Sequence, residues 1–550
     1  MNTPVDTPRD SAPAGLDPLG KPPERTSIFF KPFNASGEFL LSAQGHEVRR
    51  LAVKGAGATT VAQALGLLIQ IGSTLILARL LTPTDFGLVT MVTTFSLLFM
   101  NAGGNGFTEA ILQRKDLDHA LASNLFWINV GTGLVLTIVF ASAGSLMARF
   151  YGNSRVVAIA AGLSLTIFIT STSVLHLALL MRAMRFPIVY ANQIFARFVS
   201  LTGTILLALA GWGYWALVGG AVLQPLTECI GAWILCRWTP GWPRRVAATG
   251  SMVRFAIHVY GRFSFNYFAR NVDNLLVGWR FNAQSLGFYK KAYDLFSLSS
   301  ILQAFTPVAV SALSRLNQDP AQYKRHLLKA ISVWTFLGMG VGGAITLVGK
   351  DLIRVLLGPK WGIAGEIFTY FGPGFGIMFI YGIHGWIHLS LGRPGRWFKW
   401  GIIEFTVTAL MFVLALHWGP AGVAASWSLS LLILTLPAMV YAGQPINLKV
   451  SELFSAIWRF LVAAMLAGGA TAAGVLVLAN QQGSTSTAMA AVRMILISLL
   501  FGVLYTLGVV LLHGNWSPLI QVRNLLREML DRRRSSQVLA APESSAPVNQ

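Results

Sequence analysis

The sequence predicts an all-α polytopic membrane protein of about 14 transmembrane helices, built as two six-helix lobes followed by two C-terminal helices. Three observations support this fold class: the composition, the spacing of long apolar runs and an internal repeat. Of the 550 residues, 54% are hydrophobic and 11% are charged, whereas soluble domains average about 25% charged residues. Large soluble catalytic domains are therefore excluded, because closely spaced membrane spans leave little room for them.

The apolar runs give the expected helices, since most of them approach the roughly 20 residues that cross ~30 Å of hydrocarbon. The boundaries within 190–236 and 363–416 are the least defined, because two runs follow each other closely in each. The runs occupy residues 55–78, 86–104, 121–142, 156–180, 190–211, 214–236, 255–279, 292–313, 327–349, 363–391, 395–416, 419–442, 455–478 and 491–513.

The runs and their flanks divide the chain into five parts. The Pro-rich, polar start is expected to be a disordered cytoplasmic tail, because it has too little apolar content to offset the entropy of ordering. The segment from Pro518 to Arg534 alternates apolar and basic residues and predicts an amphipathic helix on the inner leaflet. The parts are a tail (1–48), an N-lobe with spans 1 to 6 (49–236), a C-lobe with spans 7 to 12 (255–442), spans 13 and 14 (455–513), and a basic amphipathic helix followed by a disordered tail, both cytoplasmic (514–550).

Two stretches about 200 residues apart resemble each other. LILARLLTPTDFGLVTMVTTF starts at Leu75 and LLVGWRFNAQSLGFYKKAYDL starts at Leu275, so Gly87 aligns with Gly287. Six spans separate the two stretches, which makes the repeat parallel, with its axis along the membrane normal. Duplicated bundles of this kind place their substrate between the halves and rock one half against the other.

The positive charge is placed between the spans. A net charge of +21 would suggest a nucleic-acid partner in a soluble protein, but here most Lys and Arg residues lie in alternate connecting segments. We therefore predict no nucleic-acid partner and, from the positive-inside rule, two cytoplasmic termini. This orientation puts the turns after spans 1 and 7 outside the cytoplasmic membrane.

Polar residues form stripes on three predicted spans. An Arg at mid-bilayer costs roughly 2.5–3.5 kcal/mol, so Arg197 and Arg270 are expected to face a shared cationic cavity rather than lipid. An alternative for Arg270, compatible with the first, is an i,i+3 ion pair with Asp273. The stripes consist of Gln63 and Gln70 with two threonines on span 1, Arg197 with Gln193, Ser200 and Thr204 on span 5, and Arg262, Asn266, Arg270 and Asp273 on span 7.

Intramembrane acids are candidates for coupling transport to a proton or a sodium ion, because desolvation lets buried carboxyl groups titrate near physiological pH. Asp273 ranks first, and Asp294, Glu228 and Glu404 follow. The alternative for Glu228 and Glu404 is a helix-end or interhelical hydrogen bond. We predict no cofactor, metal or catalytic residue, since His384 and His388 lack an acidic third ligand nearby.

Several segments, in this order, resemble the polysaccharide-transport family of Wzx-type flippases, within the superfamily of multidrug, oligosaccharidyl-lipid and polysaccharide exporters. They are LARLLTPTDFGLV at 77–89, AILQRKDLD at 110–118 with SNLFWIN after it, LMRAMRF at 180–186, RNVDNLLVG with LGFYKKAYDL within 270–295, and LLGPKW at 356–361. The resemblance covers residues 50–510. The long N-terminal tail departs from the family's usual short start.

The resemblance implies a transporter rather than an enzyme. It would flip an undecaprenyl-diphosphate-linked oligosaccharide across the bacterial inner membrane for exopolysaccharide, capsule or O-antigen synthesis, with membrane lipid and polysaccharide polymerase machinery as expected partners. Arg270, Arg197 and Arg262 would hold the diphosphate or an acidic sugar, since guanidinium groups suit phosphate and carboxylate oxygens. Two alternatives stay open: a multidrug-type extruder of the same fold, and a membrane polysaccharide polymerase or glycosyltransferase.

Overall fold

A computed structural model describes most of the chain. The described residues are 28–40, 46–114, 116–244, 246, 249–299, 305–479, 486–517, 519–521 and 523. They contain sixteen α-helices and no named strand, and eleven helical stretches are long and apolar enough to cross a membrane. The all-α polytopic class is confirmed, whereas the number of about 14 spans stays a prediction.

The helices follow the predicted apolar runs, with span 8 divided between α8 and α9 and span 10 between α11 and α12. The first group comprises α1 (His46–Leu80), α2 (Pro83–Gln113), α3 (His119–Tyr151), α4 (Arg155–Arg182), α5 (Phe186–Leu209), α6 (Tyr214–Leu235) and α7 (Thr249–Arg280). The second comprises α8 (Ala283–Phe296), α9 (Thr306–Ser314), α10 (Pro320–Leu357), α11 (Gly362–Tyr381), α12 (Ile383–Ser390), α13 (Pro394–Ala415), α14 (Gly419–Gly443), α15 (Val450–Ala479) and α16 (Thr487–His513), with a 3₁₀ turn, η2 (Pro359–Trp361), before α11.

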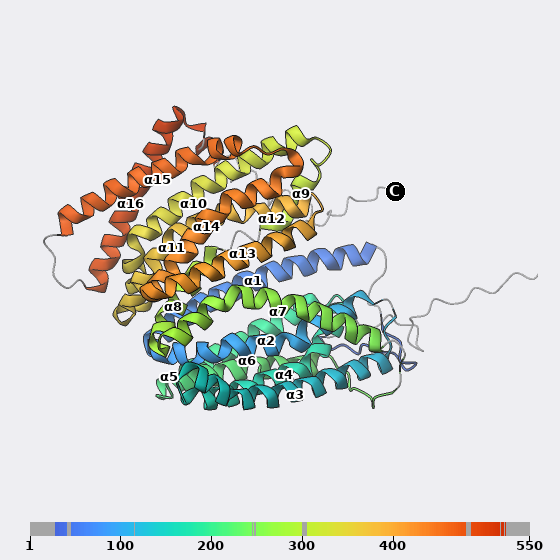
Figure 1. The fold of residues 1–550 in the computed structure, drawn as a ribbon. Helices are drawn as coiled ribbons and strands as arrows, with labels where there is room; N and C mark the ends of the chain where they lie inside the picture. Colours follow the sequence, from blue (N-terminus) through green and yellow to red (C-terminus); the bar gives the residue numbers. More distant parts are fainter. Residues whose placement is uncertain are drawn as a thin grey trace, which may run out of the picture.

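The two groups form two bundles that meet near α8 and the start of α2 (Figure 1). Helix α7 connects the bundles: it packs mainly against α2 and also touches α3, α8, α13 and α14. Helix α1 packs against α5 and reaches α10 of the other bundle. Helices α15 and α16 pack against α10 and against each other. The connection between bundles therefore depends on α1, α2, α7 and α8.

The two repeated stretches start their helices in the same way. Before α2, the Thr82 amide donates to Asp85 Oδ2 over 2.9 Å, and the Asp85 amide donates to Thr82 Oγ1 over 3.3 Å, which is a reciprocal capping box. Before α8, the Ser285 amide donates to Asn282 Oδ1 over 2.8 Å. Caps 200 residues apart thus fix where α2 and α8 begin, and so place Gly87 and Gly287 on the first turns.

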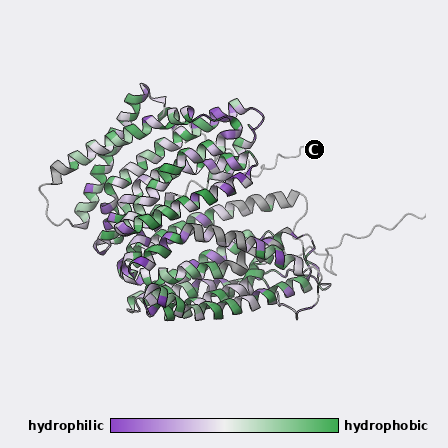
Figure 2. Ribbon diagram, viewed as in Figure 1, coloured by the Kyte–Doolittle hydropathy of each residue, from purple (hydrophilic) through white to green (hydrophobic). Residues whose placement is uncertain are grey.

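Hydrophobic residues occur along the helices of both bundles, as the hydropathy colouring of the ribbon shows (Figure 2), and many large apolar side chains are exposed. Leu499 and Leu511 on α16 are 62% and 79% exposed, for example. Exposed apolar area of this extent marks a surface made for a partner or for lipid. Together with the length of the helices, it matches a chain whose outer surface contacts lipid tails.

The expectation of a disordered start is wrong for residues 28–40, which pack on the first bundle. The Phe30 amide donates to the Leu235 carbonyl and the Arg237 amide to the Phe30 carbonyl, each over 2.9 Å. Phe30 is buried, and the Arg185 guanidinium lies 4.8 Å from its ring centre. We call residues 28–40 the strap. Two more arginines lie over its aromatic rings, Arg182 over Phe39 and Arg237 over Phe29. Cation–π contacts between these aromatic rings and arginines thus help to offset the entropy of ordering residues 28–40.

Candidate functional site: the junction between the bundles

The repeated glycines meet face to face where the bundles touch. A Cβ at Gly87 would lie 1.6 Å from the Ala283 carbonyl oxygen, and one at Gly287 would lie 1.8 Å from the Pro83 carbonyl oxygen. Each glycine therefore lets the backbone of the other bundle approach without a side chain between them. Pro83 and Ala283 are also 200 residues apart, so the contact is nearly symmetric. We call this contact, with the α1–α2 turn and η2 around it, the junction.

Trp361 of η2 fills the junction beside the glycines. It is fully buried, and its Nε1 donates to the Ala78 carbonyl over 2.7 Å. Its ring packs edge-on against Phe86 of the first bundle at 5.6 Å and Phe288 of the second at 6.0 Å between ring centres. A buried indole whose N–H is bonded across the bundles is a strong local tie, because aromatic rings bury a large apolar area.

Two cations close the rim of the junction. Arg79 Nη2 donates to the Val355 carbonyl over 3.1 Å, and Lys360 Nζ donates to the Arg79 carbonyl over 2.8 Å. Lys360 and Trp361 belong to the LLGPKW motif, which carries part of the family resemblance but for which no site was predicted. The position of Trp361 shortly after a Gly-Pro pair gave no signal of which bundle its ring would contact, because that depends on tertiary packing.

Asp273 lies at the end of α7, next to the junction, and is fully buried. Its Oδ2 accepts hydrogen bonds from the Tyr289 hydroxyl at 2.7 Å and from Trp427 Nε1 at 3.0 Å. Its Oδ1 has no hydrogen-bond partner in the described part of the chain. Asp273 thus joins α7 to α8 and α14 of the second bundle. The side chain of Arg270, its predicted ion-pair partner, lies outside the described residues.

Asp294, another predicted coupling acid, is held by two lysines of its own helix. Lys290 Nζ lies 2.5 Å from Asp294 Oδ1, and Lys291 Nζ lies 3.5 Å from Oδ2. The Lys291 ammonium also lies 4.0 Å from the centre of the Phe86 ring, across the junction. Asp294 is therefore engaged in a charge cluster that reaches from α8 to α2.

The remaining two acids take part in contacts between neighbouring helices. The Glu228 side chain on α6 accepts a hydrogen bond from Gln193 on α5 and lies within electrostatic reach of Arg197. Glu404 on α13 is hydrogen-bonded to the Tyr381 hydroxyl of α11, which also accepts from Trp400 Nε1 over 3.0 Å. Both arrangements match the alternative of an interhelical hydrogen bond.

The predicted stripes are placed around α1 and α5. Gln63 and Gln70 are exposed on α1. Arg197 on α5 is exposed, and its guanidinium occupies the space where a Cβ of Gly66 on α1 would be. Ser200, from the same stripe, turns toward α6 and donates to the Gly220 carbonyl over 2.8 Å. The α5 stripe therefore lies between helices at one end and reaches α1 at Arg197.

Three predicted ligands cannot be placed as side chains. Arg262, Asn266 and Arg270 lie on α7, whose backbone is described at these positions, but their side chains lie outside the described residues. Helix α7 packs mainly against α2, whereas α5, which carries Arg197, packs mainly against α6 and α1. The predicted cationic cavity thus stays a prediction.

A family model described as "Polysaccharide biosynthesis protein" matches residues 76–364, more than half of the chain. The chain belongs to this family. Related proteins include the lipopolysaccharide biosynthesis protein WzxC of Escherichia coli K12, 22% identical over 57% of this chain and 65% of its own length, slightly under two thirds. The succinoglycan biosynthesis transport protein ExoT of Rhizobium meliloti is 22% identical over 60% of this chain and 68% of its own.

Solved structures share the fold of this polysaccharide biosynthesis family member. The structure described as lipid II flippase MurJ in an inward closed conformation has a TM-score of 0.64 at 12% identity, covering 85% of this chain and all of its own. An inward-facing multidrug resistance MATE transporter of the MOP superfamily has a TM-score of 0.54 at 13% identity, covering 70% and 95%. At these low identities the likeness shows a shared fold. The family match confirms the predicted family, and the name of ExoT as a transport protein agrees with the prediction of a transporter rather than an enzyme.

Proposed function

We propose that this protein flips an undecaprenyl-diphosphate-linked oligosaccharide across the bacterial cytoplasmic membrane, by rocking its two bundles about the junction. The observation that carries the proposal is the nearly symmetric contact of Gly87 with Gly287, sealed by Trp361. Two duplicated bundles that meet at one end of the membrane suit alternating access. The names of WzxC and ExoT place those relatives in polysaccharide biosynthesis and transport, which supports a glycan as cargo.

The proposed orientation puts the junction on the outer side of the membrane. Most connecting segments at the opposite end carry an excess of Lys and Arg, so the positive-inside rule places that end and both termini in the cytoplasm. A state with its outer end closed would then receive cargo from the inner leaflet. Exposed Gln63 and Gln70 on α1 support a polar route for this cargo beside α1, since amide side chains are poorly solvated by lipid.

The proposed diphosphate ligands are Arg197, Arg270 and Arg262. Arginine offers planar, multidentate donors to phosphate oxygens. Arg197 is available for this role because it is exposed beside α1. Downstream polymerase machinery would be the partner that uses the flipped glycan.

Asp273 is the proposed site of ion coupling, by a proton or a sodium ion. Among the four predicted acids, it is the one that links α7 to the second bundle beside the junction and that has a carboxylate oxygen without a partner in the described chain. Asp294, in contrast, already has two ammonium partners. Movement of α7 would therefore change the surroundings of Asp273 more directly than those of the other acids.

The substrate proposal is tested with Arg197→Ala and Arg270→Ala in cells that lack the native gene. We expect lipid-linked oligosaccharide to accumulate on the inner leaflet, because each variant removes a phosphate donor. Arg155→Ala, which removes an exposed arginine at the start of α4, is the matched control and should flip normally. Normal flipping by both cavity variants at wild-type protein levels would reject the proposed ligands.

A further inference from the structure

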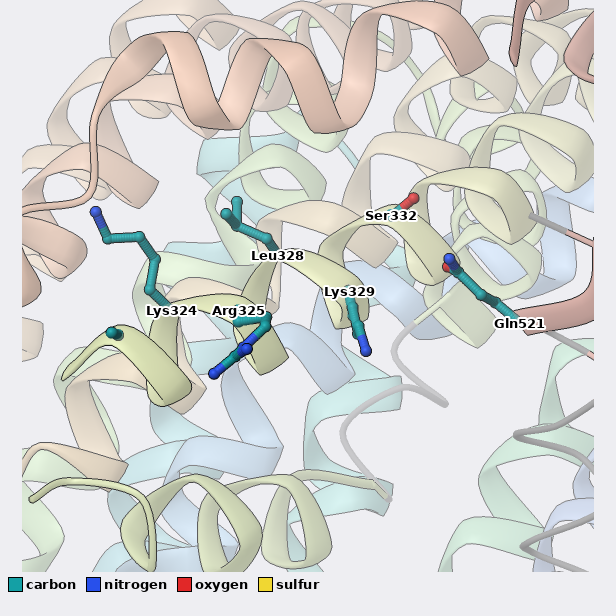
Figure 3. Close-up of a pocket in the computed structure, with 7 residues that line it drawn as sticks. Lys324, Arg325, Leu328, Lys329, Ser332 and Gln521 are labelled. Atoms are coloured by element: carbon teal, nitrogen blue, oxygen red, sulfur yellow. The ribbon is translucent and has the colours of Figure 1, made fainter. Parts of the chain in front are cut away.

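A second charged site lies at the opposite end of the second bundle, away from the junction. The first turns of α10 and the segment after α16 line an open cavity of about 430 Å³ on the surface. Three basic residues of α10 line it, together with one residue of the C-terminal segment (Figure 3). The lining residues used in the argument are Lys324, Arg325, Leu328, Lys329, Ser332 and Gln521.

The three basic residues differ in their partners. Lys324 Nζ donates to both carboxylate oxygens of Glu452 over 3.1 Å and to the Asn447 carbonyl over 3.0 Å. Arg325 and Lys329 are exposed and have no anionic partner within the described part of the chain. In Figure 3 their side chains leave α10 on the same side, and Lys324 leaves it on another. Glu452 is thus paired with Lys324, which leaves Arg325 and Lys329 without an acidic partner among the described residues.

The two remaining cations are placed where electrostatics disfavours them. They are four residues apart on one helix, a spacing at which like charges repel. An anion beside Arg325 and Lys329 would offset this repulsion.

We infer that this cavity binds the phosphate of an anionic phospholipid of the inner leaflet. Arg325 and Lys329 would donate to the phosphate oxygens, and Ser332 and Gln521 would donate to the remaining headgroup oxygens. Leu328 provides an apolar wall beside them. Exposed Trp516, just after α16, places this end of the bundle at the membrane interface, where a phospholipid headgroup is present and its acyl chains can stay in the bilayer.

The test measures phosphatidylglycerol retained by the full chain after purification in detergent, by native mass spectrometry. In Arg325→Gln with Lys329→Gln, the affinity for phosphatidylglycerol is expected to fall about tenfold or more, as loss of a charge-assisted hydrogen bond implies. The control, Arg393→Gln with Lys399→Gln, removes two exposed charges at the start of α13, one just before the helix and one within it, and should retain the lipid. Folding of each variant is checked by its thermal unfolding profile.

Two outcomes would overturn the inference. One is equal retention of phosphatidylglycerol by the α10 variant and the wild type. The other concerns thermal unfolding. If inorganic phosphate in lipid-free detergent stabilises the protein against thermal unfolding as much as phosphatidylglycerol does, and if this stabilisation depends on the same two residues, the ligand is a soluble anion. Neither outcome bears on the flipping proposal, because lipid retention is measured without transport.

Discussion

At Asp273 a carboxylate with no exposed surface receives hydrogen bonds from two aromatic side chains of the second bundle. Burying a charged group is costly unless hydrogen bonds compensate. The side chain of Asp273 is therefore better explained as a link between α7 and the second bundle than as a free ligand in an open cavity. A group that links moving parts is also well placed to respond to a proton or ion.

Replacing Asp273 with Ala is expected to destabilise the protein. It leaves the Tyr289 hydroxyl and Trp427 Nε1 buried without an acceptor, at about 1–3 kcal/mol for each unpaired group. The measurement is denaturant unfolding in detergent. Glu366→Ala is the control, because its ion pair with Lys350 is exposed and should contribute below about 1 kcal/mol. Equal stability of the two variants would show that the link at Asp273 is unimportant.

Gly87 is expected to tolerate no side chain while the junction is closed, because a Cβ there would overlap the Ala283 carbonyl. Gly87→Ala should therefore shift the population toward a separated junction. The reporter is Ala283→Cys, a position that is 6% exposed, labelled from outside with an impermeant maleimide. Labelling should be faster with Gly87→Ala and unchanged with Gly72→Ala, whose Cβ would have no neighbour within 4 Å. A rate unaffected by Gly87→Ala contradicts the closed contact.

At the scale of elements, the strap ties the ends of α4 and α6 and the start of α3. Besides its contacts with Arg182, Arg185 and Arg237, the strap accepts a hydrogen bond at the Gly37 carbonyl from the His119 amide over 2.8 Å. It covers Cys236, and burial raises the pKa of the Cys236 thiol to about 12. The thiol is therefore neutral well below pH 12 and reacts poorly, because the thiolate is the nucleophile.

Release of the strap should make Cys236 reactive. Phe30→Ala, in a Cys229→Ala background, is expected to increase maleimide labelling of Cys236 at pH 8, because exposure returns the thiol pKa toward its ordinary value near 8.5. Ile28→Ala is the control, since Ile28 is 60% exposed. Labelling that stays slow after Phe30→Ala would mean that the strap does not protect the ends of the helices.

Helix α7 contacts helices of both bundles. Near its middle, the Tyr260 hydroxyl donates to the Leu98 carbonyl of α2 over 3.2 Å, while Asp273 near its end is bonded to α14. Rocking of one bundle against the other must therefore strain one of these contacts or bend α7. The sequence placed this helix in the C-lobe as span 7, whereas its contacts are mainly with α2 of the first bundle and reach the second bundle near its end.

At the scale of the whole molecule, the sequence was informative where one physical rule dominated. Apolar length located the helices, and the spacing of Gly87 and Gly287 identified the repeat whose two copies meet at the junction. An interhelical hydrogen bond was foreseen as the alternative for Glu228 and Glu404, but their partners, and the role of Trp361, could not be predicted because they depend on how the helices pack. The strap was missed for the same reason: its aromatic residues find arginines about 150 to 200 residues away.

The central claim is that the junction must open for lipid-linked oligosaccharide to cross the membrane. The Lys360 side chain donates to the Arg79 carbonyl across the junction. We would replace both residues with cysteine in the Cys229→Ala background and join the two cysteines with a reducible bis-maleimide in proteoliposomes. Flipping should stop on cross-linking and return on reduction, and Arg79→Cys alone should be unaffected by the reagent. Continued flipping with the junction cross-linked would contradict the account.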